Sequence, residues 1–351
     1  GRTPNTALAL KRMYLAKSVN TAGDFGPGWT HNWETKLLAV SNTVNTNLLW
    51  IDENGGAWAF ARNADNSFTS PPGFFGTLVE FSDRYELRKP KGIVLTFSRN
   101  AQVAPIGRLL SLTEPHGEKI VFTYNSAGQL QTMSTALAGS VSFLRNSDGR
   151  IVRVTRDRDS LSYTYTYDNA GRLASSADID GNTTTYNYVD APEYPAANGL
   201  LSAITDPLGR QIFFGYYVNG QSWYQWEPGN ALRTFTYGIT PTNYLYTIVS
   251  DINEQTSIYY FDDRFRLVQT TNPDNSYSLL GWNELNQVYV RVDELGRNTF
   301  YGYDDHGNIT SIQRPEDAAA VEISYDLNFD VPTSIAPLVG ASTQFTLDPA
   351  T

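Results

Sequence analysis

The sequence predicts an all-β chain folded as one long antiparallel meander of hairpins, and three observations lead to this prediction. A motif made of an aromatic residue, a polar turn and an alternating run recurs about every 21 residues. The runs alternate apolar and polar residues, which is the period of a strand rather than a helix. The composition is rich in strand and turn formers, with 22 Tyr and 27 Gly in 351 residues. Each repeat is therefore expected to be two strands and two turns.

The repeats can be aligned on the residue that precedes the first turn of each unit. Consecutive positions are 21 residues apart from Phe261 to Trp282 and from Trp282 to Tyr303, and 22 apart from Tyr303 to Tyr325. The ten aligned positions are Tyr124, Arg145, Tyr167, Tyr188, Tyr217, Tyr237, Phe261, Trp282, Tyr303 and Tyr325. We expect Tyr167, Tyr188, Trp282 and Tyr303 to occupy equivalent places on one face of the sheet.

Glycines mark both turns of a repeat. Gly171 and Gly307 follow the aligned aromatic residue by four positions, and Gly181 lies in the second turn. Glycine permits the positive φ that such turns require, while Asp and Asn bond to the turn backbone. We therefore expect φ above zero at Gly171 and Gly307.

The repeat pattern divides the chain into two predicted regions. Residues 106–351 form an array of about ten repeats, and residues 1–105 form an N-terminal β cap of five or six strands that continues into them. Hairpin signals in the cap lie at residues 54–56 and 91–92. Its least repetitive stretch, "DFGPGWTHNWE" at residues 24–34, is expected to plug an open end of the sheet.

Charge and composition exclude several classes of partner. The net charge of −10 disfavours nucleic acid and anionic membranes, which require clustered cations. There is no run of about 18 apolar residues, so no membrane span is predicted. The absence of cysteine excludes disulfides and thiolate sites. The first residues already suggest a strand, so a trimmed N-terminus is expected.

No catalytic motif emerges from the sequence. The three histidines, His31, His116 and His306, fall in separate predicted turns, and a metal site or acid–base dyad would need two of them to meet. The "DIDGN" stretch at residues 178–182 begins like a calcium loop, but its twelfth position is Val189 instead of glutamate. We predict no cofactor, no metal and no enzymatic activity, with His31 and His306 as the residues to watch.

Two stretches carry a resemblance to a known family. "YDNAGRL" at residues 167–173, followed by "DIDGNTTTYNY", resembles the YD repeat of the Rhs family, which is shared with toxin-complex shells, wall-associated proteins and teneurins. "FGPGWTHNWE" at residues 25–34 is similar to the segment before the repeats in many Rhs proteins. The resemblance implies a curved or spiral sheet that forms part of a hollow shell around a toxin or effector polypeptide, in a secreted or cell-surface bacterial protein.

The chain departs from that family in lacking its self-cleavage motif and toxin domain. "TDPLGRQ" at residues 205–211 resembles part of the cleavage motif but lies in repeat register, so we interpret it as a turn. The expected function is a non-catalytic shell or scaffold segment, whose partners are the remainder of a larger shell or an enclosed cargo.

Two alternatives stay open at this point. Aromatic stripes on a sheet could bind sugars, so a carbohydrate-binding or carbohydrate-active surface module is the functional alternative. They could equally form a cross-strand ladder that holds the sheet together. A β-propeller is the structural alternative, because two repeats of about 21 residues would make one four-stranded blade.

Overall fold

The computed structural model describes residues 8–40, 47–229, 231–326, 330–337 and 340–345. This part is all-β apart from two short 3-10 helices, η1 (Ala16–Ser18) and η2 (Pro90–Gly92). The chain divides into two compact units: unit 1 consists of residues 1–188 and 199–209, and unit 2 of residues 189–198 and 210–351. Within the described ranges, no helix has the length and apolarity that crossing a membrane requires.

Unit 1 contains a long antiparallel sheet in which each strand pairs with the next along the chain. Its strands are β9 (Thr77–Glu80), β10 (Arg84–Arg88), β11 (Val94–Ser98), β12 (Leu109–Thr113), β13 (Lys119–Tyr124), β14 (Leu130–Thr135), β15 (Gly139–Arg145), β16 (Ile151–Arg156), β17 (Leu161–Tyr167), β18 (Leu173–Ala177), β19 (Thr183–Tyr188) and β20 (Leu201–Thr205).

Eight strands precede this sheet in unit 1. They are β1 (Arg12–Tyr14), β2 (Ala22–Gly23), β3 (Gly26–Pro27), β4 (Trp29–His31), β5 (Lys36–Val40), β6 (Asn47–Ile51), β7 (Ala57–Arg62) and β8 (Phe68–Thr69). β1 pairs with β4, β2 pairs with β3, and β5 to β8 form a four-stranded sheet. The hairpins expected around residues 54–56 and 91–92 are present as β6–β7 and β10–β11.

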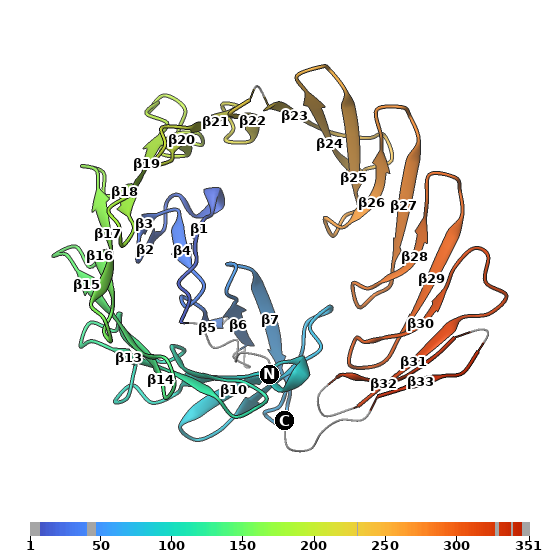
Figure 1. Cartoon of the computed structure of the whole chain (residues 1–351), viewed down its shortest axis with the longest axis horizontal. Coiled ribbons are helices and arrows are strands. Elements are labelled where there is room, and N and C mark those ends of the chain that lie inside the picture. Colours follow the sequence, from blue (N-terminus) through green and yellow to red (C-terminus); the bar gives the residue numbers. More distant parts are fainter. Residues whose placement is uncertain (1–7, 41–46, 230, 327–329, 338–339, 346–351) are drawn as a thin grey trace. The chain divides into compact units, whose positions relative to one another are not determined.

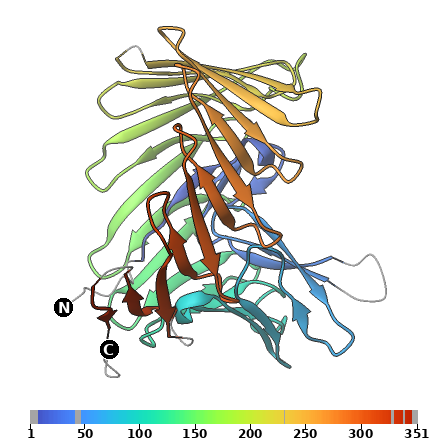
Figure 2. The ribbon, with the colours of Figure 1, turned by 90° about the vertical axis from the view of Figure 1, so that its right-hand side faces the viewer.

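Unit 2 repeats the same meander. Its strands are β21 (Gln211–Tyr216), β22 (Ser222–Glu227), β23 (Ala231–Ile239), β24 (Leu245–Asp251), β25 (Thr256–Phe261), β26 (Leu267–Thr271), β27 (Tyr277–Trp282), β28 (Val288–Val292), β29 (Asn298–Tyr303), β30 (Ile309–Gln313), β31 (Val321–Tyr325), β32 (Pro332–Ala336) and β33 (Thr343–Gln344). Figure 2 shows β24 to β31, coloured orange to red, as successive hairpins.

The predicted all-β meander is confirmed, and the propeller alternative is wrong. A propeller breaks its pairing after every four strands. Here pairing is unbroken from β9 to β20 in unit 1 and from β21 to β33 in unit 2. Eleven strands precede residue 105 in the described chain, several of them only two or three residues long, against the five or six expected. The sheet continues past this point because β11 pairs with β12, and a domain boundary at residue 105 stays a prediction.

Most hairpin turns are built in the same way. An Asp or Asn directly after the first strand accepts hydrogen bonds from the backbone N–H groups two and four residues later, as Asp168 does from Ala170 and Arg172. The acidic side chains therefore stabilise turns, as the sequence suggested. The turn closes through residues with positive φ, which is 76° at Gly171 and 83° at Gly307.

Gly171→Ala is expected to lower the free energy of unfolding by more than about 1 kcal/mol, the usual cost of a Cβ at positive φ. A Cβ at Gly171 would also overlap the Arg150 guanidinium, whereas nothing lies within 4 Å of one at Gly181, which has φ of 83°. Gly181→Ala is therefore the matched control and should cost about 1 kcal/mol. Urea denaturation measures both, and an unchanged stability of Gly171→Ala would contradict the turn geometry.

The second strand of ten described hairpins carries one extra residue opposite the end of the first strand. The extra residues are Leu110, Gln131, Val152, Ala174, Ser202, Trp223, Val268, Tyr289, Thr310 and Thr333. Such bulges increase the local twist and bend the strand. Nothing in the sequence pattern had predicted them.

The two faces of each sheet differ. One side carries the aligned aromatic residues and is called the aromatic face; the other is called the opposite face. On the aromatic face of unit 1, buried side chains include Phe122, Met133, Phe143, Val154 and Tyr165. From residue 210 onward, no described hydrophobic side chain is buried. The core therefore lies in unit 1, where a second layer covers the sheet.

Candidate functional site

The second layer of unit 1 begins with a segment that lies on the aromatic face of the repeat sheet. This docked segment, residues 12–35, contains β1 to β4, and Figure 1 shows these strands in blue beside β17 and β18 in green. It packs on the aromatic face of the sheet rather than plugging an open end, because its aromatic rings contact Tyr165 of β17 and Tyr186 of β19.

Glycines allow the docked segment to pack closely on the sheet and within itself. Gly26 and Gly28 have φ of 87° and 76°, which only glycine adopts without strain. A Cβ on Gly26 would stand 2.5 Å from the carbonyl oxygen of Gly171, and one on Gly28 would stand 2.6 Å from the Tyr14 ring. Close packing therefore requires the two glycines of the "FGPGW" stretch.

Aromatic side chains of the docked segment interlock with those of the sheet. Phe25 is fully buried, and its ring centroid lies 4.8 Å from that of Tyr165. The Trp29 ring lies 4.9 Å from the Tyr186 ring, and its Nε1–H donates to the Tyr188 hydroxyl at 2.8 Å. These edge-to-face contacts favour one specific docking geometry.

The aligned aromatic residues share one hydrogen bond within each sheet. Their ring O–H or N–H donates to the carbonyl of the first residue of an earlier strand, about 15 positions back in sequence. The bonds run from Tyr124 to Leu109 (2.7 Å), Tyr167 to Ile151 (2.6 Å), Tyr188 to Leu173 (2.7 Å), Trp282 to Leu267 (2.7 Å) and Tyr303 to Val288 (2.6 Å). Burial raises the pKa of these tyrosines, so they remain neutral donors.

The other aligned positions differ from this arrangement. Tyr237 lies inside β23 opposite Thr247, and Phe261 has no ring donor. Tyr217 lies one residue too late, because the turn begins with its N–H bonded to Gln221, and Tyr216 occupies the last paired position. The Tyr217 hydroxyl donates forward to the carbonyl of Phe235 at 2.9 Å. Tyr325 is at the expected place, opposite Pro332, and burial raises its pKa.

Tyr303→Phe is expected to lower the free energy of unfolding by about 1 kcal/mol, because the Val288 carbonyl loses its donor. Tyr289→Phe, at a bulge position with an exposed ring, is the control and should change stability by less than about 0.5 kcal/mol. Equal effects of the two substitutions in urea denaturation would show that the hydrogen bond from Tyr303 to the Val288 carbonyl does not contribute to stability.

The series of ring-to-carbonyl hydrogen bonds made by the aligned residues is called the ladder. Arg145 occupies one of the aligned positions of the ladder and joins the docked segment to the sheet. Its Nη2 donates to the Leu130 carbonyl at 3.2 Å, as a ladder tyrosine would. Both terminal nitrogens also bind Asp24 of the docked segment, Nη1 to Oδ1 and Nη2 to Oδ2, each at 2.8 Å. The arginine is therefore a ladder residue whose charge holds Asp24, 121 residues away in sequence.

His31 completes this buried cluster. Its side chain is 1% exposed, and Nε2 lies 3.1 Å from Asp24 Oδ2. Its Nδ1 accepts the backbone N–H of Trp33 at 3.2 Å, so the neutral ring carries its proton on Nε2 and donates it to Asp24. Both ring nitrogens are therefore hydrogen-bonded to other groups of the docked segment.

Asp24 remains ionised in this cluster. Burial by itself would raise its pKa, but hydrogen bonds from His31 and Arg145, together with the charge of Arg145, outweigh burial and hold the pKa of Asp24 well below its usual range. A depressed folded pKa means that the ionised group stabilises the fold fully above about pH 4 and loses this contribution as the pH falls.

The melting temperature of Asp24→Asn is therefore expected to lie below that of the natural chain at pH 7, with a smaller gap at pH 3. Asp180→Asn, on an exposed turn, is the matched control and should show no gap at either pH. Thermal unfolding monitored by circular dichroism provides the measurement. A gap that is the same at both pH values would contradict the role of Asp24.

His306 of unit 2 also pairs with a carboxylate. Its Nδ1 lies 2.7 Å from Asp330 Oδ1, and Asn308 Nδ2 donates to the same oxygen at 3.1 Å. The His306 side chain is 42% exposed and that of Asp330 is 5% exposed. The third histidine, His116, lies on an exposed turn of unit 1. In the part of the chain that the structure describes, no serine or threonine hydroxyl is hydrogen-bonded to any of these histidines, so no nucleophile–base pair is formed.

No metal centre is evident in the described ranges, where no three His, Asp or Glu side chains gather as ligands would. At the "DIDGN" stretch, Asp178 Oδ1 accepts the N–H groups of Asp180 and Asn182, so this stretch is a hairpin turn. At "TDPLGRQ", Gly209 has φ of 78° and its N–H bonds to the Asp206 carbonyl, which is also a turn. The predictions of no metal, no cofactor and no catalysis stay predictions.

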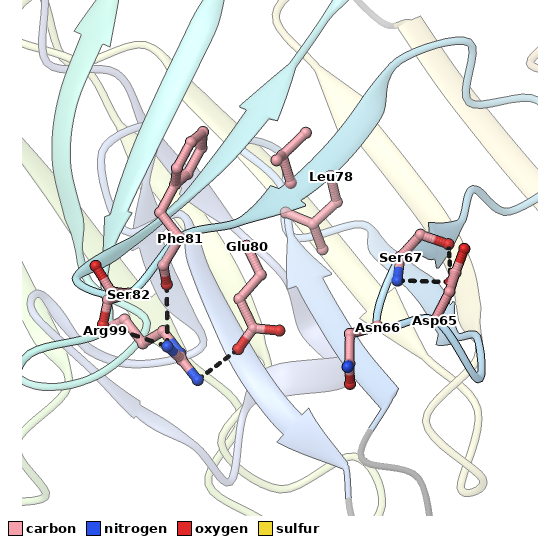
Figure 3. A pocket seen from close by; sticks show the side chains of 9 residues that line it. Asp65, Asn66, Ser67, Leu78, Glu80, Phe81, Ser82 and Arg99 are labelled. Carbon is pink, nitrogen blue, oxygen red and sulfur yellow. Dashed lines mark hydrogen bonds and ion pairs between the residues drawn. The ribbon is translucent and has the colours of Figure 1, made fainter.

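The described part of unit 1 contains cavities, of which two bear on function. One, of about 480 Å³, lies between the turn at residues 65–67 and β9 (Figure 3). Glu80 of this cavity forms ion pairs with Arg62 and Arg99, each at 2.7 Å, so these two arginines already compensate its negative charge. The other, a groove of about 610 Å³, separates residues 8–10 from the aromatic face, where Met133 and Val154 line it.

The comparisons with known proteins bear on this geometry. The family model described as "RHS Repeat" matches residues 145–183, which contain Arg145 and the hairpins that receive the docked segment. Residues 145–183 therefore contain an RHS repeat. A second model, "Domain of unknown function (DUF6531)", matches residues 3–60 and so includes the docked segment.

Curated relatives of this chain are much longer than it is. It is 26% identical over 258 residues to "tRNA nuclease WapA" of Bacillus subtilis (strain 168), covering 63% of the chain and 10% of the relative. It is 22% identical over 218 residues to "Double-stranded DNA deaminase toxin A" of Burkholderia cenocepacia (strain H111), covering 58% of the chain and 14% of the relative. The chain thus spans a small fraction of each relative that it matches.

Two solved structures are similar to this chain over most of its length. One is "Crystal Structure of TcdB2-TccC3", with a TM-score of 0.43, 11% identity, and coverage of 83% of this chain and 17% of that one. Another is the Photorhabdus luminescens Tc holotoxin pore with the TccC3-D651A mutation, with a TM-score of 0.44, 11% identity, and coverage of 88% and 20%.

Proposed function

We propose that this chain is a non-catalytic wall segment of a secreted or cell-surface bacterial RHS protein, whose aromatic face binds polypeptide of an enclosed toxin or effector. The observation that carries the proposal is the docked segment. In unit 1 the aromatic face buries an extended, glycine-rich polypeptide through ring contacts and one ion pair.

The aromatic face of unit 2 offers the same chemistry, and its side chains are less buried within the described residues of that unit. Leu280, Trp282, Tyr301, Tyr303 and Ile312 lie on it at positions equivalent to those that the docked segment contacts or that surround it in unit 1. Each of these side chains is only partly buried. A strand or loop of another polypeptide would bury them as the docked segment buries Tyr165 and Tyr186.

Longer relatives named as a nuclease and a deaminase toxin support a toxin-related role. The absence of catalysis is supported by His31, whose two ring nitrogens are both hydrogen-bonded inside a closed cluster. No observation favours the carbohydrate alternative, because the ladder tyrosines use their hydroxyls to bind the backbone of the sheet.

Fluorescence anisotropy with labelled, reduced and carboxymethylated α-lactalbumin tests the binding face at 0.15 M salt. This unfolded probe is acidic like the chain, so charge attraction does not drive binding. Leu280→Glu with Tyr301→Glu is expected to weaken binding at least tenfold, since it places charges on the aromatic face. Leu144→Glu, on the opposite face of unit 1, is the control. No binding by the natural chain, or equal losses in both variants, would refute the proposal.

An activity screen tests the non-catalytic part. The purified chain is expected to release no product from polysaccharides, peptides or RNA above a blank. Turnover that His306→Ala abolishes, while the fold is retained by circular dichroism, would establish an enzyme and overturn this part of the proposal.

A further inference from the structure

The groove between residues 8–10 and the aromatic face of unit 1 is lined mainly by apolar side chains. Met133, Val141 and Val154 belong to its sheet side, which is called its floor, and Tyr163 at the same floor is 47% exposed. The volume of the groove, about 610 Å³, lies within the range of about 300–1,000 Å³ that is usual for small-molecule sites. The groove can therefore hold a small apolar ligand.

The charged residues that line this groove are arginines. They are Arg12, Arg156 and Arg158, and no acidic side chain is found among the described lining residues. The chain as a whole has a net charge of −10, so this excess of cations is a local feature of the groove. Arg156 and Arg158 pair with Asp159 at 2.6 Å and 3.6 Å. Arg12 is left as the groove arginine whose ion pairs in the described ranges include no carboxylate.

The Arg12 guanidinium is held in place by neutral groups. Its Nη2 donates to the hydroxyls of Ser176 and Tyr186, at 3.1 Å and 3.3 Å, and its central carbon lies 5.0 Å from the centre of the Tyr165 ring. Its Nη1 is buried and has no hydrogen-bond partner among the described residues. A cation partly removed from water without a negative partner is costly, and an anion beside it would offset that cost.

The floor of the groove has few backbone groups to offer a ligand. Strands β14 to β17 pair with one another, so their N–H and C=O groups are already bonded within the sheet. On the other wall, the Ala9 carbonyl accepts Asn32 Nδ2 and Trp33 Nε1. A peptide bound here would leave amide groups unpaired, a cost that a hydrocarbon chain does not have. The docked segment avoids this cost by pairing with itself, which a single short segment in the groove cannot do.

We propose that this groove binds a free fatty acid, with its carboxylate at Arg12 and its hydrocarbon chain along Met133, Val154 and Tyr163. The chain displaces water from apolar side chains, and the carboxylate makes the charge-assisted hydrogen bonds for which a guanidinium is suited. Polypeptide binding by the aromatic face of unit 2 is a separate matter, so either proposal can fail without the other.

Isothermal titration calorimetry of the full chain with decanoate, below the concentration at which it forms micelles, tests the site. Decanol has the same chain without the charge, and we expect it to bind at least about tenfold more weakly because the pair with Arg12 is lost. Arg12→Met should weaken decanoate binding by a similar factor and leave decanol binding unchanged. No binding of decanoate, or equal affinities for decanoate and decanol, would overturn the proposal.

Arg153→Met is the matched control for Arg12→Met. Arg153 is exposed on the opposite face of β16, so the substitution removes an equal charge away from the groove. It should bind decanoate like the natural chain. Equal weakening by the two substitutions would mean that net charge, rather than a carboxylate site at Arg12, governs binding, and would refute the assignment.

A second pair of variants covers the case in which Arg12→Met fails to fold. Ala138→Trp fills the groove from a lining position without truncating a core side chain, and it should abolish decanoate binding. Ala127→Trp is the control, because Ala127 lies on an exposed turn and both alanines donate their backbone N–H to a turn side chain. Decanoate binding that is the same in these two variants would place the ligand elsewhere and contradict the proposal.

An acetylated tripeptide of alanine, valine and leucine distinguishes a fatty acid from a peptide end. It has a free carboxylate and apolar side chains, with amide groups in addition. We expect it to bind more weakly than decanoate, because the floor leaves those amides unpaired. Binding as tight as that of decanoate, or tighter, would overturn the assignment to a fatty acid and favour a peptide C-terminus.

Discussion

Arg145→Ala is expected to lower the free energy of unfolding by about 3–5 kcal/mol, which is the usual cost of removing one partner of a buried ion pair. The Arg145 side chain is 7% exposed and that of Asp24 is 20% exposed, and the substitution leaves the carboxylate with His31 alone. It also removes the donor to the Leu130 carbonyl, so both the sheet and the docked segment are affected.

Arg156→Ala is the matched control for this effect. Its ion pair with Asp159 is exposed, with 43% and 35% of the side chains accessible, and such pairs contribute at most about 1 kcal/mol. Urea denaturation of both variants measures the difference. Equal, small losses would show that the Asp24–Arg145 pair does not hold the docked segment.

Restoring the ladder separates the two roles of Arg145. Arg145→Tyr supplies the aromatic donor found elsewhere in the ladder but leaves Asp24 buried without a cation, so it should remain strongly destabilised. Adding Asp24→Asn removes the unpaired charge and should recover part of the loss. A double variant no more stable than Arg145→Tyr alone would contradict this division of roles.

Phe25→Ala is expected to lower the free energy of unfolding by about 3–5 kcal/mol, as is usual when a fully buried aromatic side chain is truncated. The Phe25 ring is fully buried between Tyr165, 4.8 Å away, and His31, 5.8 Å away. Its removal leaves a cavity between the docked segment and the sheet, which the rigid strands on one side cannot close.

The control for this substitution is Phe265→Ala. Phe265 is 75% exposed on a turn, and its removal should change stability by less than about 0.5 kcal/mol. Tryptophan fluorescence adds a specific signal, because Trp29 packs in the same layer. A Phe25→Ala chain as stable as Phe265→Ala would mean that the docked segment does not contribute to the core.

The repeat architecture could be predicted from sequence because its causes are local. Alternation fixes which residues share a face, and Asp168 with Gly171 fixes a turn within five residues. Register was harder. The alignment of the repeats places Tyr217 in the ladder, whereas the last paired residue of the strand is Tyr216. Residues 216 and 217 are both tyrosines, so the sequence pattern cannot distinguish them. The bulges were also missed, since their residues share no side-chain type.

The candidate site depended on contacts between distant residues. Arg145 is the one non-aromatic residue among the ten aligned positions, but nothing in the sequence links it to Asp24. His31 was the histidine to watch for chemistry, and the structure instead occupies both of its ring nitrogens. His306 contacts Asp330, which the sequence analysis had not identified as a candidate site residue.

The sequence by itself thus determined the hairpins, their turns and the aromatic face, because each follows from neighbouring residues and a fixed period. Only the tertiary structure decided which part of that face is covered, since the docked segment joins residues 121 positions apart through burial and charge. It also decided the difference between the opposite faces of the two units, where polar hydroxyls in one and exposed apolar rings in the other become visible only once the strands are paired.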